Sequence, residues 1–378
     1  MMKKLFCIFT AVCMLLLTSC STKKDALQGL VDLNMVGSME IQYADQFSVD
    51  FYEGGYSLIT IGEDKYLLVP PEGEIPKNTE GLNIIKQPVD NIYLAASSAM
   101  DLFDGFGGIG SVTMTSTDSS GWSLPNIVSA IENGDITYIG KYNMPDYEVL
   151  LECDCGLAIE STMIYHNPET REKIQQLGIP VLVERSSYES HPLGRMEWIK
   201  LYGLLIGKYD EAETYFNEKT AAFNVLSEQD HRNETRKTVA FFYISSNGYV
   251  NIRKPGDYIS KMIELAGGKY IFNARELNID DDALSTMNIQ TETFYEIAKD
   301  ADILIYNSTI EGKLDNIQQL VDKCSVLSDF KAVKEGNVWC TEQNMFQQTT
   351  GAADMITDMN HIFSDGTDDS LTYLHKLS

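Results

Sequence analysis

The sequence has few basic residues, few histidines and no long apolar stretch. Its 378 residues include 29 lysines and arginines against 55 aspartates and glutamates, which gives a formal net charge of −26. A chain this acidic is not expected to bind nucleic acid or to adhere closely to anionic lipid. No apolar run reaches the roughly 20 residues that a permanent membrane-spanning helix needs. The body of the protein is therefore expected to lie in water.

Catalytic motifs are also missing from the sequence. The five histidines are scattered, and neither His-Glu-x-x-His nor Gly-x-Ser-x-Gly occurs. The segment from Gly105 to Gly110 has glycines spaced as in a dinucleotide-binding turn. It follows a predicted helix and precedes a predicted strand, which is the reverse of the order that such a turn requires. We therefore predict no catalytic residue, no resident cofactor and no enzymatic activity.

The first 20 residues predict export and lipidation. Two early lysines precede an apolar run from Leu5 to Leu17, which has the length of a signal-peptide core. Leu17-Thr18-Ser19-Cys20 then matches the lipobox at which bacterial lipoproteins are cut and acylated. We predict a signal peptide over residues 1–19, lipidation of Cys20, a linker over residues 20–38, and an extracytoplasmic protein anchored to the cell membrane. A plain signal peptide, in which Cys20 stands by chance, is the alternative.

Cysteine is scarce once that signal is removed. Only Cys153, Cys155, Cys324 and Cys340 follow Cys20. The Cys-x-Cys pair is too close in an extended segment to bridge easily, and the spacing lacks the paired Cys-x-x-Cys form of a structural zinc site. We favour ordinary buried thiols and predict no metal site, while a disulfide between Cys324 and Cys340 stays open.

The sequence contains enough apolar material for a large core. Hydrophobic residues make up 44% and aromatic residues 10% of the chain, which excludes a disordered protein. The length left after removal of a signal peptide is long for one domain and natural for two. Between residues 39 and 69 apolar and polar residues alternate, which predicts a small antiparallel sheet with strands at 47–51, 56–61 and 65–69.

Beyond that section the pattern changes to alternating strands and helices. Such alternation predicts parallel sheet with helices on its faces. The predicted strands are 91–96, 111–115, 157–159 and 181–183 in a first lobe (residues 39–191), and 238–244, 302–306 and 338–340 in a second lobe (residues 233–378).

A long helical pattern separates the two lobes. From Pro192 to about Asp230, apolar residues recur every three to four positions without a proline. A helix of about 30 residues would span roughly 45 Å, and Gly203 and Gly207 are expected to loosen it locally. We predict a connecting helix within residues 192–232, in an α/β fold of two Rossmann-like lobes joined by that single helix.

Several segments, in this order, resemble one family. They are Tyr147-Glu148 before Leu157-Ala158-Ile159, Leu177-Gly178-Ile179-Pro180-Val181, Met262 to Gly268 with its Ala-Gly-Gly end, Glu292 before Ala301 to Ile305, and Leu327 to Val338. The chain resembles the solute-binding proteins of ABC importers for ferric siderophores, haem and cobalamin. Cys155-Gly156 stands where Pro-Asp is usual, so that match is loose. The resemblance covers roughly residues 85 to 365.

The resemblance implies a function and partners. The chain is expected to be a monomer that holds a metal chelate or macrocycle between its lobes and delivers it to an ABC permease dimer with its ATPase. In the family, one exposed glutamate on each lobe pairs with arginines of the permease, and by position these are Glu148 and Glu292. The alternative is that both acids only stabilise helix N-termini. Glu296 competes with Glu292, because the helix is slightly longer here than in the family.

Ligand contacts are expected in loops at the carboxyl ends of the strands. Aromatic, hydroxyl and guanidinium groups there suit a large, flat, partly anionic ligand, and Tyr or Met suits a haem iron. The predicted contacts are Ser97, Met100, Trp122, Tyr142, Tyr188, Arg195, Tyr243, Ser245, Arg253, Tyr306 and Met345. A structural role is the alternative for each, and Arg195 has Glu189 and Glu197 as nearby acids.

Two rival functions stay open at this point. A lipoprotein that binds bare zinc or manganese for an importer would need three or four His, Asp or Glu ligands at the cleft. An exported α/β enzyme would need an activated nucleophile or a carboxylate pair, and no motif names one. A single helical connection also predicts little closure of the lobes when a ligand binds.

Overall fold

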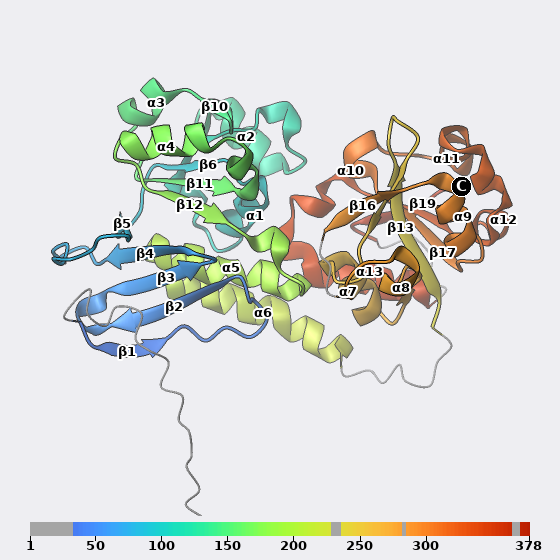
Figure 1. Cartoon of the computed structure of the whole chain (residues 1–378), viewed down its shortest axis with the longest axis horizontal. Coiled ribbons are helices and arrows are strands. Elements are labelled where there is room, and N and C mark those ends of the chain that lie inside the picture. Colours follow the sequence, from blue (N-terminus) through green and yellow to red (C-terminus); the bar gives the residue numbers. More distant parts are fainter. Residues whose placement is uncertain (1–32, 228–235, 282–284, 365–370) are drawn as a thin grey trace, which may run out of the picture.

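The protein consists of two α/β lobes side by side, with an extra β-sheet beneath the first lobe (Figure 1). The computed structural model describes residues 33–227, 236–281, 285–364 and 371–378. The predicted signal peptide, Cys20 and most of the predicted linker lie outside the described residues. Two lobes of sheet and helix with a small antiparallel section near the N-terminus confirm the predicted fold class.

The extra sheet contains the three strands predicted from alternation and two more. Its strands, in spatial order, are β1 (Met35–Ser38), β2 (Phe47–Tyr52), β3 (Ser57–Ile61), β4 (Asp64–Val69) and β5 (Asn83–Lys86). All neighbours are antiparallel except β4 and β5. Side chains of one face, such as Val49 and Ile59, join the main core, whereas Leu58 and Leu67 of the other face form a small cluster of their own. The alternation therefore reflects a sheet buried on both faces.

Two buried carboxylates hold this sheet on the first lobe. Glu197 accepts hydrogen bonds from the backbone N–H groups of Gln42, Tyr43 and Ala44 at 2.7–3.1 Å. Lys200 lies 2.9 Å from the same carboxylate, and both side chains are buried. Glu189 accepts from the next two backbone N–H groups, and burial raises its pKa to about 7. The sequence left open an ion pair of Arg195 with Glu189 or Glu197, and neither acid forms one.

The first lobe is built on a five-stranded parallel sheet. In spatial order its strands are β12 (Val181–Glu184), β11 (Leu157–Ser161), β6 (Ile92–Leu94), β7 (Val112–Thr115) and β8 (Thr137–Tyr138). The helices are α1 (Ser97–Gly105), α2 (Pro125–Asn133), α3 (Tyr147–Glu152) and α4 (Pro168–Gln176), and the short strands β9 (Gly140–Lys141) and β10 (Met144–Pro145) form a hairpin. Residues of α3 and α4 pack on one face of the sheet, and residues of α1 on the other.

The prediction of one continuous helix of about 30 residues is wrong. The segment forms two helices, α5 (Pro192–Leu205) and α6 (Tyr209–Ser227). Gly207 takes a left-handed conformation at φ +74°. The N–H of Lys208 bonds to the carbonyl of Gly203 at 2.8 Å, and the N–H of Gly207 bonds to that of Leu204 at 3.2 Å. This pair of bonds around a left-handed glycine is the Schellman motif, which ends a helix.

The two helices form an antiparallel hairpin. His191, just before α5, lies 6.3 Å from Phe223 near the end of α6, measured between ring centroids. Lys200, further along α5, lies 4.6 Å from the ring of Phe216. The helix α5 is buried on nearly all sides, and its charged residues Arg195, Glu197 and Lys200 are buried with the apolar ones. The C-terminal end of α6 lies toward the second lobe (Figure 1).

The second lobe has a mixed sheet of seven strands. These are β16 (Thr286–Ile289), β14 (Val250–Arg253), β13 (Thr238–Ile244), β17 (Ile303–Tyr306), β18 (Val338–Thr341) and β19 (Leu374–Lys376) in spatial order, with β15 (Lys269–Tyr270) also paired to β13. Its helices are α7 (Tyr258–Leu265), α8 (Ala274–Leu277), α9 (Thr291–Ala298), α10 (Ser308–Glu311), α11 (Ile317–Lys323), α12 (Lys331–Glu335) and α13 (Ala352–Phe363). Strands β13, β17 and β18, which the sequence predicted, are parallel.

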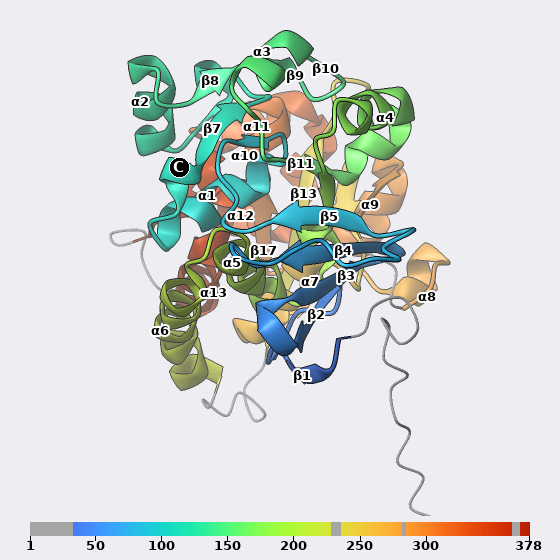
Figure 2. The same ribbon diagram turned by 90° about the vertical axis from the view of Figure 1, so that its left-hand side faces the viewer.

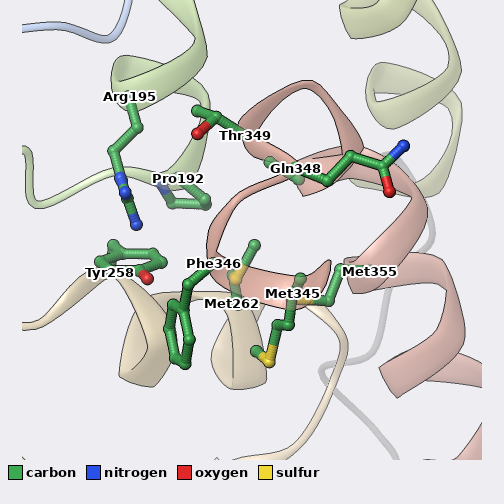
Figure 3. Close-up of a pocket in the computed structure, with 10 residues that line it drawn as sticks. Pro192, Arg195, Tyr258, Met262, Met345, Phe346, Gln348, Thr349 and Met355 are labelled. Carbon is green, nitrogen blue, oxygen red and sulfur yellow. The ribbon is translucent and has the colours of Figure 1, made fainter. Parts of the chain in front are cut away.

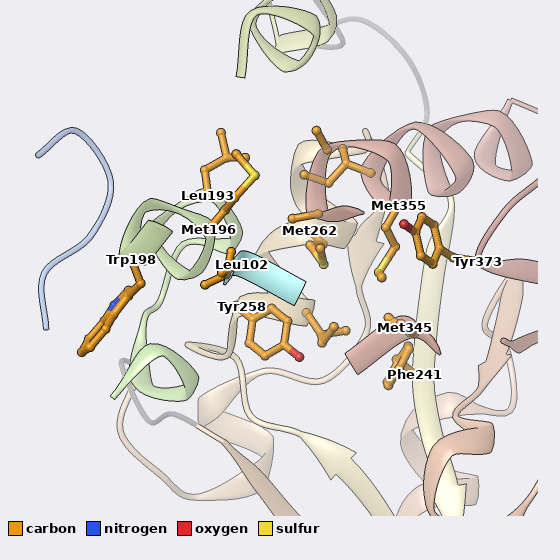
Figure 4. Close-up of a cluster of buried hydrophobic side chains, with 14 of the residues drawn as sticks. Leu102, Leu193, Met196, Trp198, Phe241, Tyr258, Met262, Met345, Met355 and Tyr373 are labelled. Atoms are coloured by element: carbon orange, nitrogen blue, oxygen red, sulfur yellow. The ribbon is translucent and has the colours of Figure 1, made fainter. Parts of the chain in front are cut away.

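One hydrophobic cluster runs through both lobes. Leu102 of α1 and Met196 of α5 belong to the same cluster as Met262 of α7 and Met355 of α13. Figure 4 shows these side chains in the space between the helices of the two lobes, and Figure 2 shows α5, α6 and α13 beside one another from the side. Among the described residues, no helix is long and apolar enough to cross a membrane.

Candidate binding cleft

The carboxyl ends of the central parallel strands of both lobes open onto two adjoining cavities. Ser97, Arg253 and Phe346 line both of them, so the cavities form one cleft between the lobes. Ser97 follows β6 in the first lobe, whereas Arg253 ends β14 and Phe346 follows β18 in the second. Polar loops at such strand ends are where ligands of open α/β sheets bind.

The first cavity is lined mainly by hydroxyl and amide groups, and we call it the amide cavity. Its volume is about 520 Å³. Its walls are Ser97, Ser120, Gly121, Ser123, Tyr243, Asn251, Arg253, Thr286, Asn307, Thr309, Ile310, Gln343, Phe346 and Gln347. Arg253 is the only charged side chain among these described residues. Hydroxyls and amides donate and accept hydrogen bonds, so the amide cavity can match either kind of group on a ligand.

The second cavity contains carboxylates, and we call it the carboxylate cavity. Its volume is about 450 Å³. Its walls are Ala95, Ala96, Ser97, Ser98, Ser161, Thr162, Met163, Glu184, Ser187, Tyr188, Arg195, Arg253, Asp257, Tyr258, Ser285 and Phe346. Each cavity falls in the range of about 300–1,000 Å³ that small-molecule sites occupy.

Arg195 is held against an aromatic ring at the junction of the lobes. Its guanidinium lies 4.1 Å from the centre of the Tyr258 ring. Figure 3 shows the side chain reaching from α5 toward this ring, above Met262, Met345 and Phe346. Arg195 is 7% exposed, and its Nε has no hydrogen-bond partner among the described residues. Because Arg195 lines the carboxylate cavity, its guanidinium can donate to an acceptor on a ligand.

Arg253 is the second guanidinium of the cleft. It lies 3.6 Å from the carboxylate of Asp257 and 4.8 Å from the centre of the Phe346 ring. Asp257 also caps α7 by accepting the N–H of Ile259 at 3.0 Å. Burial raises the pKa of Asp257, although Arg253 and Arg195 oppose that shift. Glu184 also lines the carboxylate cavity, so two guanidiniums and two carboxylates face it.

Five of the predicted contacts line the cleft. Ser97, Tyr188, Arg195, Tyr243 and Arg253 face one or both cavities. Met345 faces a small pocket of about 10 Å³ between α5, α7 and α13, which shares Arg195, Tyr258 and Phe346 with the carboxylate cavity (Figure 3).

Five other predicted contacts line neither cavity. They are Met100, Trp122, Tyr142, Ser245 and Tyr306. Met100 and Tyr306 are fully buried in the core, because residues adjacent in an element point to different sides. The indole N–H of Trp122 donates to the carbonyl of Thr117 at 3.1 Å, which turns the ring away from the cleft. Tyr142 packs in the core under α3 and α4, and Ser245 closes a turn with Tyr249.

The cleft also contains residues that the sequence did not single out. Phe346 is adjacent to a predicted contact, and Asp257 and Glu184 each lie four residues from one. Asp257 precedes α7 as a helix cap, and Glu184 ends β12, so both resembled structural residues in the sequence. Glu184 breaks an otherwise apolar strand, which is the signal that could have identified it.

Glu148 and Glu292 occupy equivalent places in the two lobes. Glu148 lies in the first turn of α3 and Glu292 in the first turn of α9, and both side chains are exposed. Glu296, the competing acid, is exposed as well. Asp146 already caps α3 through its side chain, so Glu148 is not needed to satisfy the backbone N–H groups there.

The described cysteines are free thiols. Cys155 and Cys340 are buried, and Cys153 and Cys324 are partly exposed. Burial raises the pKa of Cys340 to about 11, which disfavours the reactive thiolate. Within the described residues, no group of three or more histidine, cysteine, aspartate or glutamate side chains is arranged to hold a metal ion.

Two α/β lobes with a polar and aromatic cleft between them define a two-lobed solute-binding protein. Residues 97–344 match the model of the periplasmic binding protein family, and the chain belongs to that family. The match covers more than half of the chain and includes both lobes. It confirms the resemblance found in the sequence, and it confirms the prediction of a binding protein rather than an enzyme.

Similar proteins are lipoproteins of an archaeon. One uncharacterized lipoprotein of Methanocaldococcus jannaschii is 25% identical over 295 residues, which are 75% of this chain and 68% of the relative. A second uncharacterized lipoprotein of the same organism is 24% identical over 358 residues, 90% of this chain and 88% of the relative. The likeness to the second therefore extends over the extra N-terminal sheet as well as the two lobes.

Solved structures share the fold of the two lobes. A periplasmic haem-binding protein of Pseudomonas aeruginosa has a TM-score of 0.60 at 12% identity, over 76% of this chain and 98% of that chain. The haem-binding protein HutB of Vibrio cholerae has a TM-score of 0.56 at 16% identity, over 71% of this chain and 98% of that chain. The catecholate-siderophore binding protein VctP of Vibrio cholerae has a TM-score of 0.56 at 13% identity, over 73% of this chain and 94% of that chain. These proteins are covered almost fully, while about a quarter of this chain lies outside them.

Proposed function

We propose that the protein captures a metal chelate or macrocycle in the cleft and delivers it to an ABC transporter permease. The candidate cargoes are a ferric siderophore, haem or cobalamin. The single observation that carries this proposal is the cleft itself, in which two guanidiniums and four aromatic rings line adjoining cavities of about 520 and 450 Å³. The family and the fold of haem-binding and siderophore-binding proteins support the same class of cargo.

The residues of the cleft favour a chelate over a bare metal ion. Arg195 and Arg253 attract the carboxylate, catecholate or phosphate groups that surround a chelated metal. Tyr188, Tyr243 and Phe346 offer flat apolar surface to a macrocycle. A zinc or manganese carrier would instead place several carboxylates or histidines around one point.

Thermal unfolding of the purified protein against a panel of ligands tests the proposal. The panel holds haemin, cyanocobalamin, ferric trihydroxamate and tricatecholate siderophores, and divalent zinc and manganese. A ligand present at about 100 times its Kd adds about 2.7 kcal/mol to the free energy of unfolding, which raises the Tm by several degrees. A shift with a chelate or macrocycle supports the proposal. A shift with zinc or manganese alone contradicts it in favour of a metal-ion carrier.

A matched pair of variants links that shift to the cleft. Arg253→Gln removes a cleft guanidinium, and Arg275→Gln removes the same charge from an exposed position on α8 that lines neither cavity. We expect Arg253→Gln to abolish most of the ligand-induced shift and Arg275→Gln to leave it intact. Equal shifts in both variants would place the ligand elsewhere.

Two exposed glutamates are proposed to dock the loaded protein on the permease dimer. Rigid lobes hold Glu148 and Glu292 apart, so the pair can match two basic pockets and fix the orientation of the complex. Replacing both by alanine is expected to leave ligand binding unchanged and to abolish stimulation of the transporter's ATPase. Glu296→Ala is the control, and loss of stimulation with that control alone would reassign the second-lobe contact.

The protein is proposed to be a monomer held at the cell membrane by acyl chains on Cys20. The basic start, apolar run and lipobox support this anchor, and two or three acyl chains bind a bilayer far more tightly than one. Cys20→Ala is expected to move the protein from the membrane fraction to the soluble fraction. Retention of that variant in the membrane fraction would contradict lipidation at this position.

A further inference from the structure

The two cavities of the cleft differ in their charged groups. The amide cavity has one charged wall residue, Arg253. The carboxylate cavity has two guanidiniums and two carboxylates, contributed by both lobes. Asp257 is committed to Arg253 and to the cap of α7. Glu184 has no cationic partner among the described residues, and it is therefore the acidic group of the cleft that a ligand can meet.

Glu184 is fixed in place by two donors of its own lobe. Its Oε1 accepts the hydroxyl hydrogen of Ser98 at 3.0 Å, and its Oε2 accepts the backbone N–H of Ser186 at 2.7 Å. The side chain is 2% exposed, yet it belongs to the wall of the carboxylate cavity. A carboxylate offers about four lone-pair positions, so these two bonds leave acceptor capacity for a ligand.

Among the described residues, no basic side chain forms an ion pair with Glu184. Both of its hydrogen bonds come from neutral donors, the Ser98 hydroxyl and the Ser186 backbone N–H. A buried carboxylate without a cationic partner is costly, and a charged donor on a ligand would supply that partner.

We infer that Glu184 selects cargo that carries a charged hydrogen-bond donor, such as an ammonium group, besides the acceptor groups that Arg195 and Arg253 hold. This inference rests on the proposed function and names the class of chelate within it. A chelate rimmed only by carboxylates would place like charge against Glu184. A chelate with both an ammonium group and acceptor groups satisfies the carboxylate and the two guanidiniums of the cavity.

One pair of probes changes the charged donor of the ligand and keeps the rest of the chelate. Ferrioxamine B, a ferric trihydroxamate, ends in an ammonium group with three N–H donors, and its N-acetyl derivative has one neutral amide N–H in that place. Titration of the full-length protein with both ligands measures the ratio of their Kd values. We expect ferrioxamine B to bind at least about tenfold tighter, as for a hydrogen bond between charged groups.

Glu184→Gln then assigns that preference to one side chain. Glutamine keeps the shape and one acceptor, so the ratio of Kd values within the pair is expected to fall to within about threefold of one. Glu169→Gln, an exposed change on α4, is the control and keeps the wild-type ratio. If Glu184→Gln does not fold, the ratio of Kd values measured with the wild-type protein still shows whether the cleft prefers a charged donor.

The failures of the two proposals can be told apart. Equal affinity for both members of a pair, or a preference that persists in Glu184→Gln, overturns the inference about Glu184 and leaves the importer function standing. If neither probe binds, this inference is overturned, whereas the proposed function still stands on a thermal shift with haemin or cyanocobalamin. Tighter binding of the N-acetyl derivative than of ferrioxamine B by the wild-type protein overturns the inference directly.

Discussion

Glu160 is a carboxyl group without a hydrogen bond in the core of the first lobe. It lies on β11 beside Val183 of β12, on the face that α3 and α4 cover. The side chain is fully buried, and neither oxygen has a partner among the described residues. Burial alone raises its pKa to about 8. The neighbouring Tyr93 hydroxyl also has no hydrogen-bond partner, and its pKa is raised, mainly by burial. Tyr93 therefore supplies neither a hydrogen bond nor an opposite charge to Glu160.

This environment predicts that Glu160 makes the protein less stable as the pH rises. The folded state holds the proton up to about pH 8, whereas the unfolded state releases it near its ordinary value. Its contribution to stability is therefore fully present below the unfolded pKa and is lost as the pH rises through the folded pKa. Because Gln does not titrate, Glu160→Gln is expected to gain on the order of 3 kcal/mol relative to wild type between pH 5 and pH 8.

Urea unfolding of both proteins at pH 5 and pH 8 measures this gain. Glu148→Gln, an exposed change in the same lobe, is the control and is expected to show no such pH-dependent difference. A constant difference between Glu160→Gln and wild type at the two pH values would mean that Glu160 is ionised in the folded protein.

At the scale of single residues, the sequence predicted the loops that face the cleft well. It predicted less well which side chains of those loops point into the cleft. Ser97, Arg195 and Arg253 were identified because they follow strands or begin the helix at the junction. Tyr306 was misplaced by a single position, since Asn307 lines the cavity and Tyr306 points into the core. The direction of a side chain at a strand end depends on where the strand stops, and hydrophobic periodicity does not fix that residue.

The end of α5 decides the architecture of the connection between the lobes. The apolar pattern continues through Ile206 and resumes after Lys208, so periodicity favoured one helix. Gly207 carries the left-handed conformation that reverses the chain, and only this residue distinguishes a hairpin from a continuous helix. The close approach of Gly203 to Ala212 completes the reversal, because a Cβ at Gly203 would lie 2.4 Å from that of Ala212. Packing between the two helices overrides the local preference for continuation.

Gly207→Ala is predicted to destabilise the protein through the backbone alone. A Cβ at Gly207 meets only Pro88, at an ordinary 3.8 Å, so there is space for it. The left-handed conformation costs a residue with a Cβ about 1–2 kcal/mol, and the Tm should fall by a few degrees for a chain of this size. The control is Gly110→Ala, which has open space and no positive φ, and should change Tm little. Equal Tm values for the two variants would refute the role of the turn at Gly207.

Across the whole molecule, the lobes are joined by direct contacts as well as by the chain. The carboxylate of Asp101 in α1 accepts the backbone N–H of Thr350 at 2.7 Å, and the hydroxyl of Thr349 donates to the carbonyl of Ser98 at 2.9 Å. The amide of Gln347 bonds to the backbone of the first lobe at both of its ends, at 2.7 Å each. These bonds, together with a core that continues across both lobes, oppose a large hinge rotation.

Asp101→Ala is predicted to weaken this junction. The change leaves the N–H of Thr350 buried without its partner, which costs about 1–3 kcal/mol. Asp354→Ala is the matched control, since its bond to Lys219 is exposed and 3.4 Å long and such pairs contribute at most about 1 kcal/mol. Urea unfolding should rank Asp101→Ala clearly below Asp354→Ala. The reverse order would indicate that the lobes are not held together at α1.

A crystal structure of the complex with the chelate that gives the largest thermal shift tests the central claim most directly. Anomalous scattering from the chelated metal locates the cargo independently of the protein coordinates. The account predicts the metal between the lobes, within the cavities that Ser97, Arg253 and Phe346 share, with the lobes rotated by less than roughly 20° from the free protein. A metal bound on the outer surface of either lobe, away from these residues, would contradict it.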